Sequence, residues 1–425
     1  MSGDWRRIAG RLASPRGLLA AAMVMLALYL ALAPKPWEVQ VAATIAEGGK
    51  VALEDFVADG LWWASLVNLL LLGGLLATAR WWLQPLAQPA RARRGAPRWV
   101  PSRRIVLILL LGICGLALVE RLPRLGLSLW NDEEYSLRRY VLGYEEARDD
   151  GGLRFKPVEW RETLFFNRGA NNHIPFSIAA KLSLGVWRLF AADEGRQFAE
   201  WAYRLPPLLA GLASVFAIGW LVARIGAPVA GLASALAFAL HPWHIRYSVE
   251  ARGYSIMLLA VVLALLFAAL ALGSGRWRHW LAFGGCQFVM LWAFPGAVYL
   301  ALVMNAGLLV CTLADRPLAG RGLRQLLRLA VSNLLAAAAF IQLMGPSLRQ
   351  IQLYLARDIA HGAMGPDWFL DIGAHLFAGV RYAMDDPQFP QYLSLQHIPG
   401  FAGGGGAPVA LALAALTLAG LARAA

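Results

Sequence analysis

Charged residues and cysteines are both scarce in this sequence. Only 15% of the 425 residues are Asp, Glu, Lys or Arg, whereas 59% are hydrophobic. The three cysteines, Cys114, Cys286 and Cys311, lie in apolar stretches without metal-ligand spacing, which argues against a disulfide framework or a cysteine-ligated metal. The chain also lacks a Walker A sequence, a dinucleotide-binding fingerprint, and the HExxH and GxSxG motifs. These absences argue against an ATP-driven pump, a redox enzyme, a zinc protease of that type and a serine hydrolase.

Long apolar runs dominate the rest of the chain. They neither alternate as strands would nor show the stripe of an amphipathic helix, and many are long enough to cross a bilayer. We therefore predict an all-α, polytopic helical membrane protein of about ten spans. The predicted spans are residues 17–33, 61–83, 105–122, 205–223, 228–245, 254–272, 280–294, 296–313, 329–345 and 401–421.

Arginine sets the predicted orientation. A net charge of +13 would favour nucleic-acid binding in a soluble protein, but here the arginines lie in short loops, where they mark the cytoplasmic side. Residues 84–104 carry six arginines and no acid, whereas residues 34–60 carry two lysines and five acids. We therefore expect no nucleic-acid partner, both termini inside, and three external segments at 120–204, 246–253 and 346–400.

One further apolar stretch, at 174–192, is long enough to cross but contains Lys181 and Arg188. If it lies on the outer surface as an interfacial helix, every short basic loop falls on the inner side, so we predict that arrangement. The chain then divides into two extra N-terminal spans with a basic loop (1–104), a core module with the external acidic loop (105–272) and a C-terminal membrane module (273–425).

Asp132, Glu133 and Glu134 form an acidic triplet directly after an apolar run. An ionised acid at mid-bilayer costs roughly 2.5 to 3.5 kcal/mol, so the triplet must lie in water, at the interface or in a protein cavity. Consecutive residues on a helix fan over about 200°, so only one or two of the acids can face a common site. The alternative is a solvated acidic loop, although Trp130 and Tyr135 favour a position against the interface.

Two basic residues of the same external segment have both a structural and a functional interpretation. His173 starts the predicted interfacial helix, where it is either a helix-entry residue beside the capping Asn172, or a substrate-contacting imidazole or metal ligand. Arg204 lies at the outer mouth of a predicted span. It is either a snorkelling anchor or an anion contact.

The second external segment is short and rich in functional groups. Pro242 stops the incoming apolar run, and Gly253 permits an unusual backbone turn before the next one. Glu250 and Arg252 then remain at the outer interface. They form either a structural ion pair or, beside Asp132, a carboxylate near an Arg-bound phosphate.

The order of these blocks resembles the multispanning C-type glycosyltransferases, the superfamily of the protein O-mannosyltransferases and the bacterial lipid A aminoarabinose transferase. The likeness covers about 116–272 and differs from the superfamily in two ways: two extra spans precede the acidic loop, where the superfamily usually has one, and Tyr254 stands where many aminoarabinose-type members have an acid. The blocks are Asp132-Glu133-Glu134-Tyr135-Ser136-Leu137, Asn172-His173-Ile174-Pro175-Phe176, Tyr203-Arg204-Leu205-Pro206, and His241-Pro242 through Tyr247-Ser248-Val249-Glu250-Ala251-Arg252-Gly253-Tyr254-Ser255.

The resemblance implies inverting transfer of a sugar, at the outer leaflet, from a polyprenyl-phosphate donor to a hydroxyl of a glycan, lipid or protein acceptor. The Arg- and Ala-rich composition indicates a Gram-negative-like bacterium, so we expect the inner membrane, with the site facing the periplasm. Asp132 would be the general base, Glu133 its orienting or metal-binding neighbour, and Arg204 and Arg252 candidates for the donor phosphate. The remaining candidate substrate-binding residues are His173, Glu250 and Tyr254. No ligand set has diagnostic metal spacing, so a divalent cation is left open.

Two other classes of function compete with this interpretation. A transporter or flippase for lipid-linked saccharides would use the same basic outer pocket without needing Asp132 as a base. A structural assembly subunit would leave the acidic triplet as mere surface. The enzyme and the flippase separate at Asp132, because only the enzyme needs its carboxylate for turnover.

Overall fold

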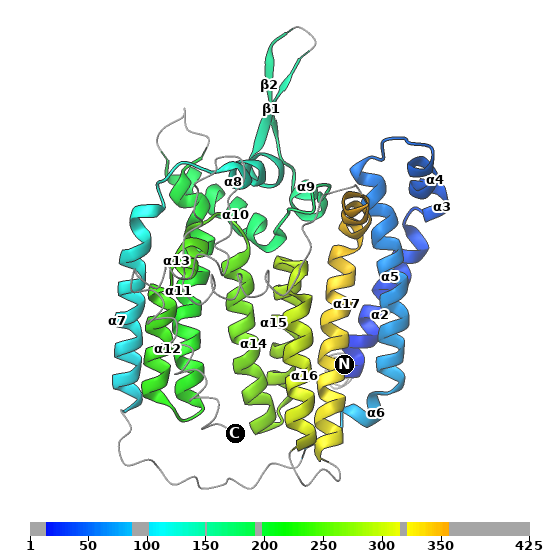
Figure 1. Ribbon diagram of the computed structural model, residues 1–425. Helices are drawn as coiled ribbons and strands as arrows, with labels where there is room; N and C mark the ends of the chain where they lie inside the picture. Colours follow the sequence, from blue (N-terminus) through cyan, green and yellow to red (C-terminus); the bar gives the residue numbers. More distant parts are fainter. Residues whose placement is uncertain (1–13, 87–101, 149–150, 192–197, 315–320, 357–425) are drawn as a thin grey trace, which may run out of the picture. The chain divides into compact units, whose positions relative to one another are not determined.

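The structure of the chain, a computed structural model, describes residues 14–86, 102–148, 151–191, 198–314 and 321–356 (Figure 1). The predicted span at 401–421 and most of the predicted external segment at 346–400 lie outside these residues. The chain forms two compact units. The first contains Met1–Ala239 and Tyr247–Arg357, and the second includes the short segment Leu240–Arg246.

Helices make up nearly all of the regular structure. Among the described residues, seven helical stretches are long and apolar enough to cross a membrane, so the chain is a predominantly helical, multi-pass membrane protein of the all-α class. A helix satisfies all its backbone polar groups internally, which lipid requires. These stretches contain α2 (Pro15–Leu32), α5 (Leu53–Ala77), α7 (Arg103–Arg121), α11 (Glu200–Arg224), α14 (Tyr254–Ser274), α16 (Val298–Ala314) and α17 (Arg321–Leu355). Further helices are α3 (Pro36–Val39), α4 (Val41–Ala46), α6 (Ala79–Trp82), α12 (Pro228–Leu240) and α15 (Trp277–Ala293).

Local sequence signals set several helix ends. The Ser14 hydroxyl accepts a hydrogen bond from the Gly17 amide at 3.1 Å and caps α2, which begins at Pro15. The apolar run predicted to be continuous over 228–245 is divided into α12 and α13 (Pro242–Val249). The break falls at Pro242 because proline has no N–H to continue the hydrogen-bond ladder of α12.

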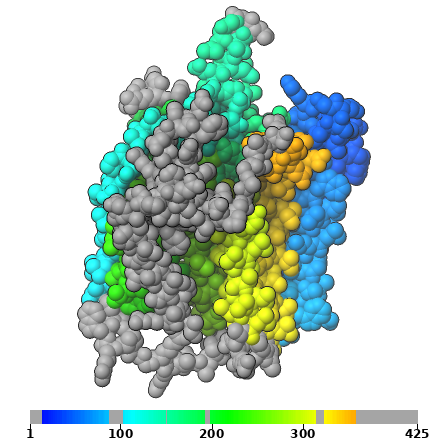
Figure 2. Space-filling view, in the orientation of Figure 1, coloured from blue at the N-terminus to red at the C-terminus, as the bar shows by residue number. Residues whose placement is uncertain are grey.

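The segment that follows α7 gathers at one end of the helices of the first unit (Figure 1). It contains α8 (Asn131–Ser136), the strands β1 (Gly143–Ala147) and β2 (Leu153–Pro157), α9 (Trp160–Phe165) and α10 (Ile174–Phe190). The antiparallel strands form a hairpin that stands away from the rest of the first unit (Figure 2). Of the seven sequence-predicted site residues, Asp132, Glu133 and His173 come from this segment. The other four, Arg204, Glu250, Arg252 and Tyr254, come from later parts of the chain.

Helix α10, which covers the ambiguous apolar stretch, has one buried and one exposed face. Ile174, Phe176 and Ala180 are completely buried against the protein, whereas Leu189 and Phe190 are 79% and 82% exposed. With 17 residues it is shorter than the roughly 20 residues that a spanning helix needs. A helix with one face on protein and an apolar outer face fits a position along the membrane interface.

Helices α5 and α17 cross at very close range. A Cβ atom added at Gly60 would lie 2.5 Å from the backbone nitrogen of Pro346, so only glycine fits at this crossing. Small residues commonly permit such contact between membrane helices, because the backbones can approach without side chains between them. The N-terminal helices are thereby attached to α17.

Both ends of α17 hold backbone groups of other segments. Near its C-terminal end, Gln350 donates a hydrogen bond to the Phe165 carbonyl at 2.8 Å and accepts one from the Asn167 amide at 2.9 Å. Near its other end, the buried Arg328 donates to the Gln84 carbonyl at 2.7 Å. One helix therefore connects the segment that follows α9 with the loop that follows α6.

Candidate functional site

Helix α8 separates the three adjacent acids into different environments. Asp132 is half-buried, Glu133 is only 1% exposed, and Glu134 lies on the surface, where it forms an ion pair with Arg138 at 3.2 Å. Successive residues on a helix point about 100° apart, so this separation follows from the spacing. The triplet therefore supplies one accessible carboxylate near the interior, Asp132, and one buried carboxylate, Glu133.

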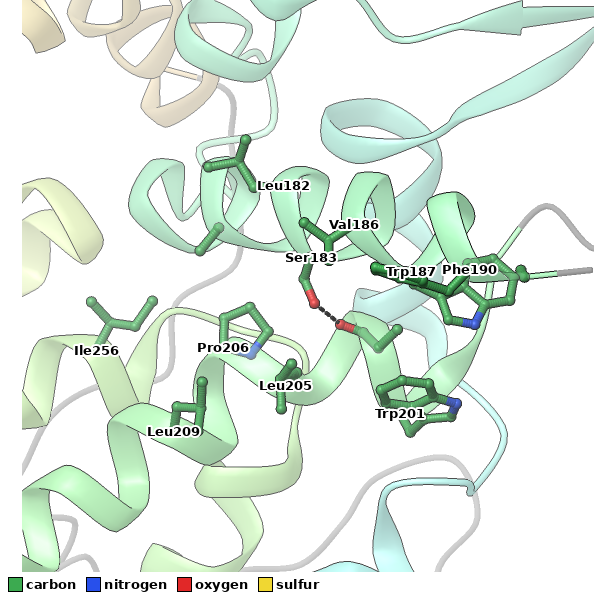
Figure 3. A pocket seen from close by; sticks show the side chains of 13 residues that line it. Leu182, Ser183, Val186, Trp187, Phe190, Trp201, Leu205, Pro206, Leu209 and Ile256 are labelled. Carbon is green, nitrogen blue, oxygen red and sulfur yellow. Dashed lines mark hydrogen bonds between the residues drawn. The ribbon is translucent and has the colours of Figure 1, made fainter.

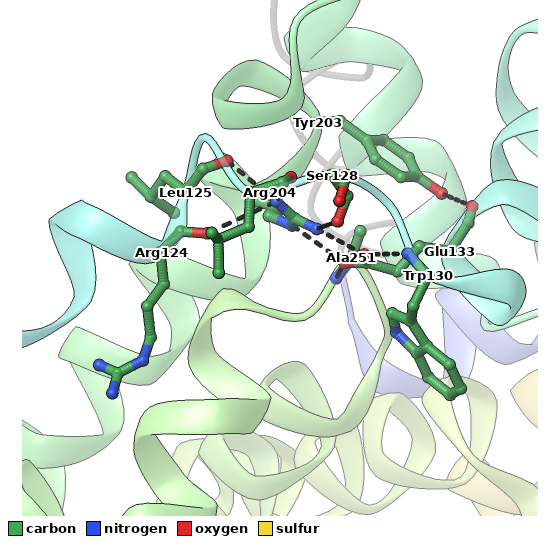
Figure 4. Close-up of polar contacts among 9 residues, drawn as sticks. Arg124, Leu125, Ser128, Trp130, Glu133, Tyr203, Arg204 and Ala251 are labelled. Atoms are coloured by element: carbon green, nitrogen blue, oxygen red, sulfur yellow. Dashed lines mark hydrogen bonds and ion pairs between the residues drawn. The ribbon is translucent and has the colours of Figure 1, made fainter. Parts of the chain in front are cut away.

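The buried carboxylate of Glu133 is fully engaged by neighbouring donors (Figure 4). Its Oε2 lies 2.5 Å from Arg204 Nη2, and its Oε1 accepts a hydrogen bond from Arg204 Nε at 3.0 Å. The Ala251 amide donates to Oε1 at 2.6 Å and the Trp130 amide to Oε2 at 3.3 Å. Glu133 thus joins α8, α11 and the segment between α13 and α14, and both its oxygens are occupied by protein donors.

Arg204 also fixes the chain that leads into α8. Its guanidinium is 4% exposed and donates hydrogen bonds to the carbonyls of Leu125 and Ser128, each at 3.1 Å, and to that of Leu127 (Figure 4). A planar guanidinium with five donors suits this multiple role. The contact between Arg204 and a donor phosphate stays a prediction, and in this structure its donors are used to hold α8 in place.

Asp132 lies between these fixed groups and the solvent-accessible side of α8. Among the described residues, none donates a hydrogen bond to its carboxylate or forms an ion pair with it, although its backbone carbonyl accepts a bond from Arg252 Nη1 at 3.4 Å. Its neighbour Glu133 is anchored, so the position of Asp132 is set by the backbone. An accessible, unoccupied carboxylate on an anchored turn can accept a proton from a bound hydroxyl.

Arg252 is a buried cation next to Asp132. It is 2% exposed, its Nη2 donates to the side-chain oxygen of Asn171, and its Nε has no hydrogen-bond partner. Within the described part of the chain, no carboxylate forms an ion pair with it. A buried charge is costly unless it is paired, so this guanidinium provides a natural position for an anion.

His173 packs directly under the turn that carries Arg252. A Cβ atom added at Gly253 would lie 2.8 Å from His173 Nδ1, so the approach of imidazole and backbone requires glycine. His173 Nδ1 lies 2.8 Å from the Ala293 carbonyl, which can only accept, so Nδ1 carries the proton. Burial, aided by the nearby Arg252 cation, lowers the pKa of His173 from 6.5 to about 3, against a smaller opposite effect of this hydrogen bond.

This lowered pKa predicts how stability depends on pH. The unfolded chain binds a proton at His173 near pH 6.5 whereas the folded chain does not, so the stabilisation is complete above pH 6.5 and is lost progressively as the pH falls toward 3. We expect the loss to be about 1.4 kcal/mol per pH unit in that window. The unfolding midpoint of the purified protein, measured from pH 7 to 4.5, should fall more steeply for the wild type than for His173→Gln. Equal slopes would contradict a neutral, buried imidazole.

Aromatic rings surround His173 on the side of α14 and α15. Its ring lies 4.9 Å from that of Tyr254 in an edge-to-face arrangement and is stacked on Phe294 at 5.9 Å. Tyr254 also contacts Phe294 at 5.8 Å and Tyr247 at 4.9 Å between ring centroids. The guanidinium carbon of Arg252 lies 5.9 Å from the centre of the Tyr254 ring, so this aromatic cluster adjoins the buried cation.

An apolar cavity of about 800 Å³ lies between α10 and α11 (Figure 3). Its lining includes Leu205, which follows Arg204 in the sequence, and Ile256 of α14. Trp187 and Trp201 also line it. The Ser183 hydroxyl in the lining already donates to the Ala202 carbonyl at 2.6 Å. The cavity has the size of an ordinary small-molecule site and offers contacts for a hydrocarbon chain.

The structure brings most of the sequence-predicted residues into one region. Arg204 is hydrogen-bonded to Glu133 and Arg252 to the backbone carbonyl of the adjacent Asp132, and His173 and Tyr254 pack beside Arg252. Glu250 is 7% exposed, and its carbonyl accepts a hydrogen bond from the Arg252 amide at 2.7 Å. Sequence reasoning missed two members of the region, Asn171 and Phe294. The sequence did offer a signal for each. Asn171 is an amide residue two positions before His173, and Phe294 is an aromatic residue directly before Pro295, which ends an apolar run.

Neither a metal site nor a relative identifies the chemistry of this region. Within the described residues, no three His, Cys, Asp or Glu side chains come together in a way that could hold a metal ion. Comparison of the chain with protein-family models, curated proteins and solved structures found no match. The fold therefore defines a multi-pass, predominantly helical membrane protein, and its function is inferred from the site.

Proposed function

We propose that this chain is a membrane glycosyltransferase of the C type, which moves a sugar from a polyprenyl-phosphate donor to an acceptor hydroxyl with inversion at the anomeric carbon. The observation that carries the proposal is Arg252, a guanidinium that is 2% exposed and lacks a carboxylate partner among the described residues. A phosphate bound there would supply the missing negative charge. Arg252 also donates a hydrogen bond to the backbone carbonyl of Asp132, whose side chain carries the accessible carboxylate.

The proposed reaction uses these two residues in one displacement. Asp132 accepts the proton of the acceptor hydroxyl while the hydroxyl oxygen forms a bond to the anomeric carbon. The bond between that carbon and the donor phosphate breaks, and its electron pair leaves with the phosphate oxygen. Arg252 offsets the charge that develops on the leaving phosphate, in the way that fixed cations stabilise such groups.

Glu133 and Arg204 have a positioning role in this proposal. Their ion pair, 2.5 Å between oxygen and nitrogen, is 1% and 4% exposed, and it fixes the turn of α8 that carries Asp132. Glu133 acts here through its protein donors, which occupy both its oxygens, and not as a metal ligand. The function of the pair is to hold the base within reach of the phosphate site.

The apolar cavity between α10 and α11 supports a lipid-linked donor. The lining of the cavity includes Leu205, which follows Arg204 in the sequence, and Ile256, which lies two residues after Tyr254. None of the lining side chains is charged. We propose that the isoprenoid chain of the donor binds in this cavity while its phosphate binds at Arg252. A donor anchored in the outer leaflet also requires the site to face outward, so we propose ten spans and a periplasmic site in a bacterial inner membrane, as the arginine distribution predicts.

The decisive experiment asks whether the donor is cleaved. The purified chain is placed in liposomes with polyprenyl-phosphate-linked sugars and an envelope fraction as acceptor, and the appearance of sugar-free polyprenyl phosphate is measured. A glycosyltransferase releases it only when acceptor is present. A flippase moves the intact donor to the other leaflet and releases none, and that result would contradict the proposal.

Arg252→Gln should weaken binding of the donor and of polyprenyl phosphate alone by about 10- to 100-fold, because a buried hydrogen bond to a charged group is worth about 1.5 to 3 kcal/mol. Binding is measured by titrating each lipid into the purified variant. Arg138→Gln is the matched control, because Arg138 pairs with Glu134 on the surface and should change neither affinity. Equal binding by Arg252→Gln and the wild type would remove Arg252 from the phosphate site.

A further inference from the structure

The connection between α15 and α16 brings non-helical backbone close to the candidate site. Helix α15 ends at Ala293, and Phe294 has the extended backbone angles φ −153° and ψ 103° before the short 3-10 turn Pro295–Ala297. The 17 residues of α15 correspond to about 25 Å, less than the roughly 30 Å hydrocarbon core. Irregular backbone at membrane depth is tolerated where it is buried in protein or lines a cavity.

Phe294 is held in place from two sides yet remains accessible. Its ring stacks on His173 with an interplanar angle of 12°, and His173 is itself bonded to the carbonyl of the preceding residue, Ala293. A Cβ atom at Gly296 would lie 2.6 Å from Cε1 of the Phe294 ring, so an edge of the ring packs against a position where only glycine fits. The Phe294 side chain is nevertheless 37% exposed.

Phe294 and Tyr254 together continue the site beyond the buried cation. Their centroids are 5.8 Å apart at an interplanar angle of 66°, and Arg252 lies 5.9 Å from the Tyr254 ring. Arg252 in turn contacts the backbone of Asp132. In an inverting displacement the acceptor oxygen attacks the anomeric carbon opposite the phosphate, so the sugar lies between Asp132 and a phosphate bound at Arg252. The Tyr254 ring, 5.9 Å from the Arg252 guanidinium, is close enough to contact that sugar.

We propose that Phe294 and Tyr254 form an aromatic wall that binds the sugar ring of the donor, which makes the substrate a saccharide with an apolar C–H face. The aromatic face carries negative partial charge and attracts the positively polarised C–H bonds of such a ring. This inference rests on the proposed function and extends it to the recognition of the sugar. The sequence-predicted residue Tyr254 gains a defined role, and Phe294 becomes a new specificity residue.

The test compares two ligands that differ only in the sugar. Affinities are measured for a polyprenyl-phosphate-linked hexose and for the same polyprenyl phosphate without sugar, with wild type, Phe294→Leu and Phe294→Trp. We expect Phe294→Leu to weaken binding of the sugar-bearing donor about 2- to 12-fold, the range that one aromatic pair contributes beyond its buried area. Binding of sugar-free polyprenyl phosphate should stay unchanged. Phe294→Trp, which keeps an aromatic face, should retain the affinity for the sugar.

Tyr299→Leu is the matched control, because Tyr299 is an aromatic residue at the start of α16 that is 74% exposed and outside the cluster. It should leave both affinities unchanged. If Phe294→Leu weakens both ligands equally, or neither, while the wild type still transfers sugar, the aromatic wall is wrong and the proposed function stands. If the wild type binds no sugar-bearing donor and transfers nothing, both are overturned.

Discussion

Asp132→Asn is expected to lower the rate of sugar transfer by about 10² to 10⁴, with donor affinity within a factor of two or so of the wild type. The amide has nearly the shape of the carboxylate but cannot accept the proton of the acceptor hydroxyl. No described residue forms a hydrogen bond or ion pair with the Asp132 side chain, so the substitution breaks no such contact among the described residues. Transfer is measured as the initial rate at saturating donor, and binding is measured separately with the same donor.

Glu134→Gln provides the control for this experiment. Glu134 is two residues away on the same short helix, and its ion pair with Arg138 is exposed, so its loss should change neither rate nor stability measurably. An Asp132→Asn variant that keeps more than about a third of the wild-type rate would exclude Asp132 as the base, since a positioned base contributes at least about 10². A loss in both variants would indicate a general effect of charge on α8.

Arg204→Met is expected to cause the largest loss of stability among these variants. It would leave the carboxylate of Glu133, which is 1% exposed, without its ion-pair partner and would also free the carbonyls of Leu125 and Ser128. Breaking a buried pair from one side costs about 3 to 5 kcal/mol, so the unfolding midpoint in detergent should fall by roughly 5 °C. Transfer should fall as well, because the turn that positions Asp132 is no longer fixed.

The same variant separates the two interpretations of Arg204. If Arg204→Met folds with wild-type stability but loses donor affinity, Arg204 contacts the phosphate as the sequence resemblance implies. If stability falls and the remaining folded protein binds polyprenyl phosphate normally, Arg204 is the clamp that the hydrogen bonds indicate. Arg138→Met, which removes an exposed arginine from the same region, should change stability by no more than about 1 kcal/mol.

The membrane character of the fold was predictable because lipid leaves the backbone few choices. An apolar run that must satisfy its own backbone groups becomes a helix, so a helix covers each predicted range within the described residues. The break at Pro242 was signalled by its missing N–H, although the predicted range ran through it. The prediction of ten spans stays a prediction, because the last one lies outside the described residues.

The different environments of the three acids in the triplet could not be predicted from the sequence. Helical spacing shows that the three acids point in different directions, but which direction faces the protein depends on Arg204, 71 positions away from Glu133. The same holds for Phe294, whose partner His173 lies 121 positions earlier in the chain and is tied to the neighbouring Ala293 carbonyl. Such contacts are set by helix packing, which leaves no local signal.

Helix α17 holds two distant parts of the first unit at a fixed separation. Its 35 residues correspond to roughly 50 Å, well beyond the hydrocarbon core of about 30 Å. Gln350 near one end holds Phe165 and Asn167, close to the start of α10, while Arg328 near the other holds Gln84. The distance between these two attachment points is therefore set by protein rather than by lipid, so a thinner or thicker bilayer must itself deform around the protein.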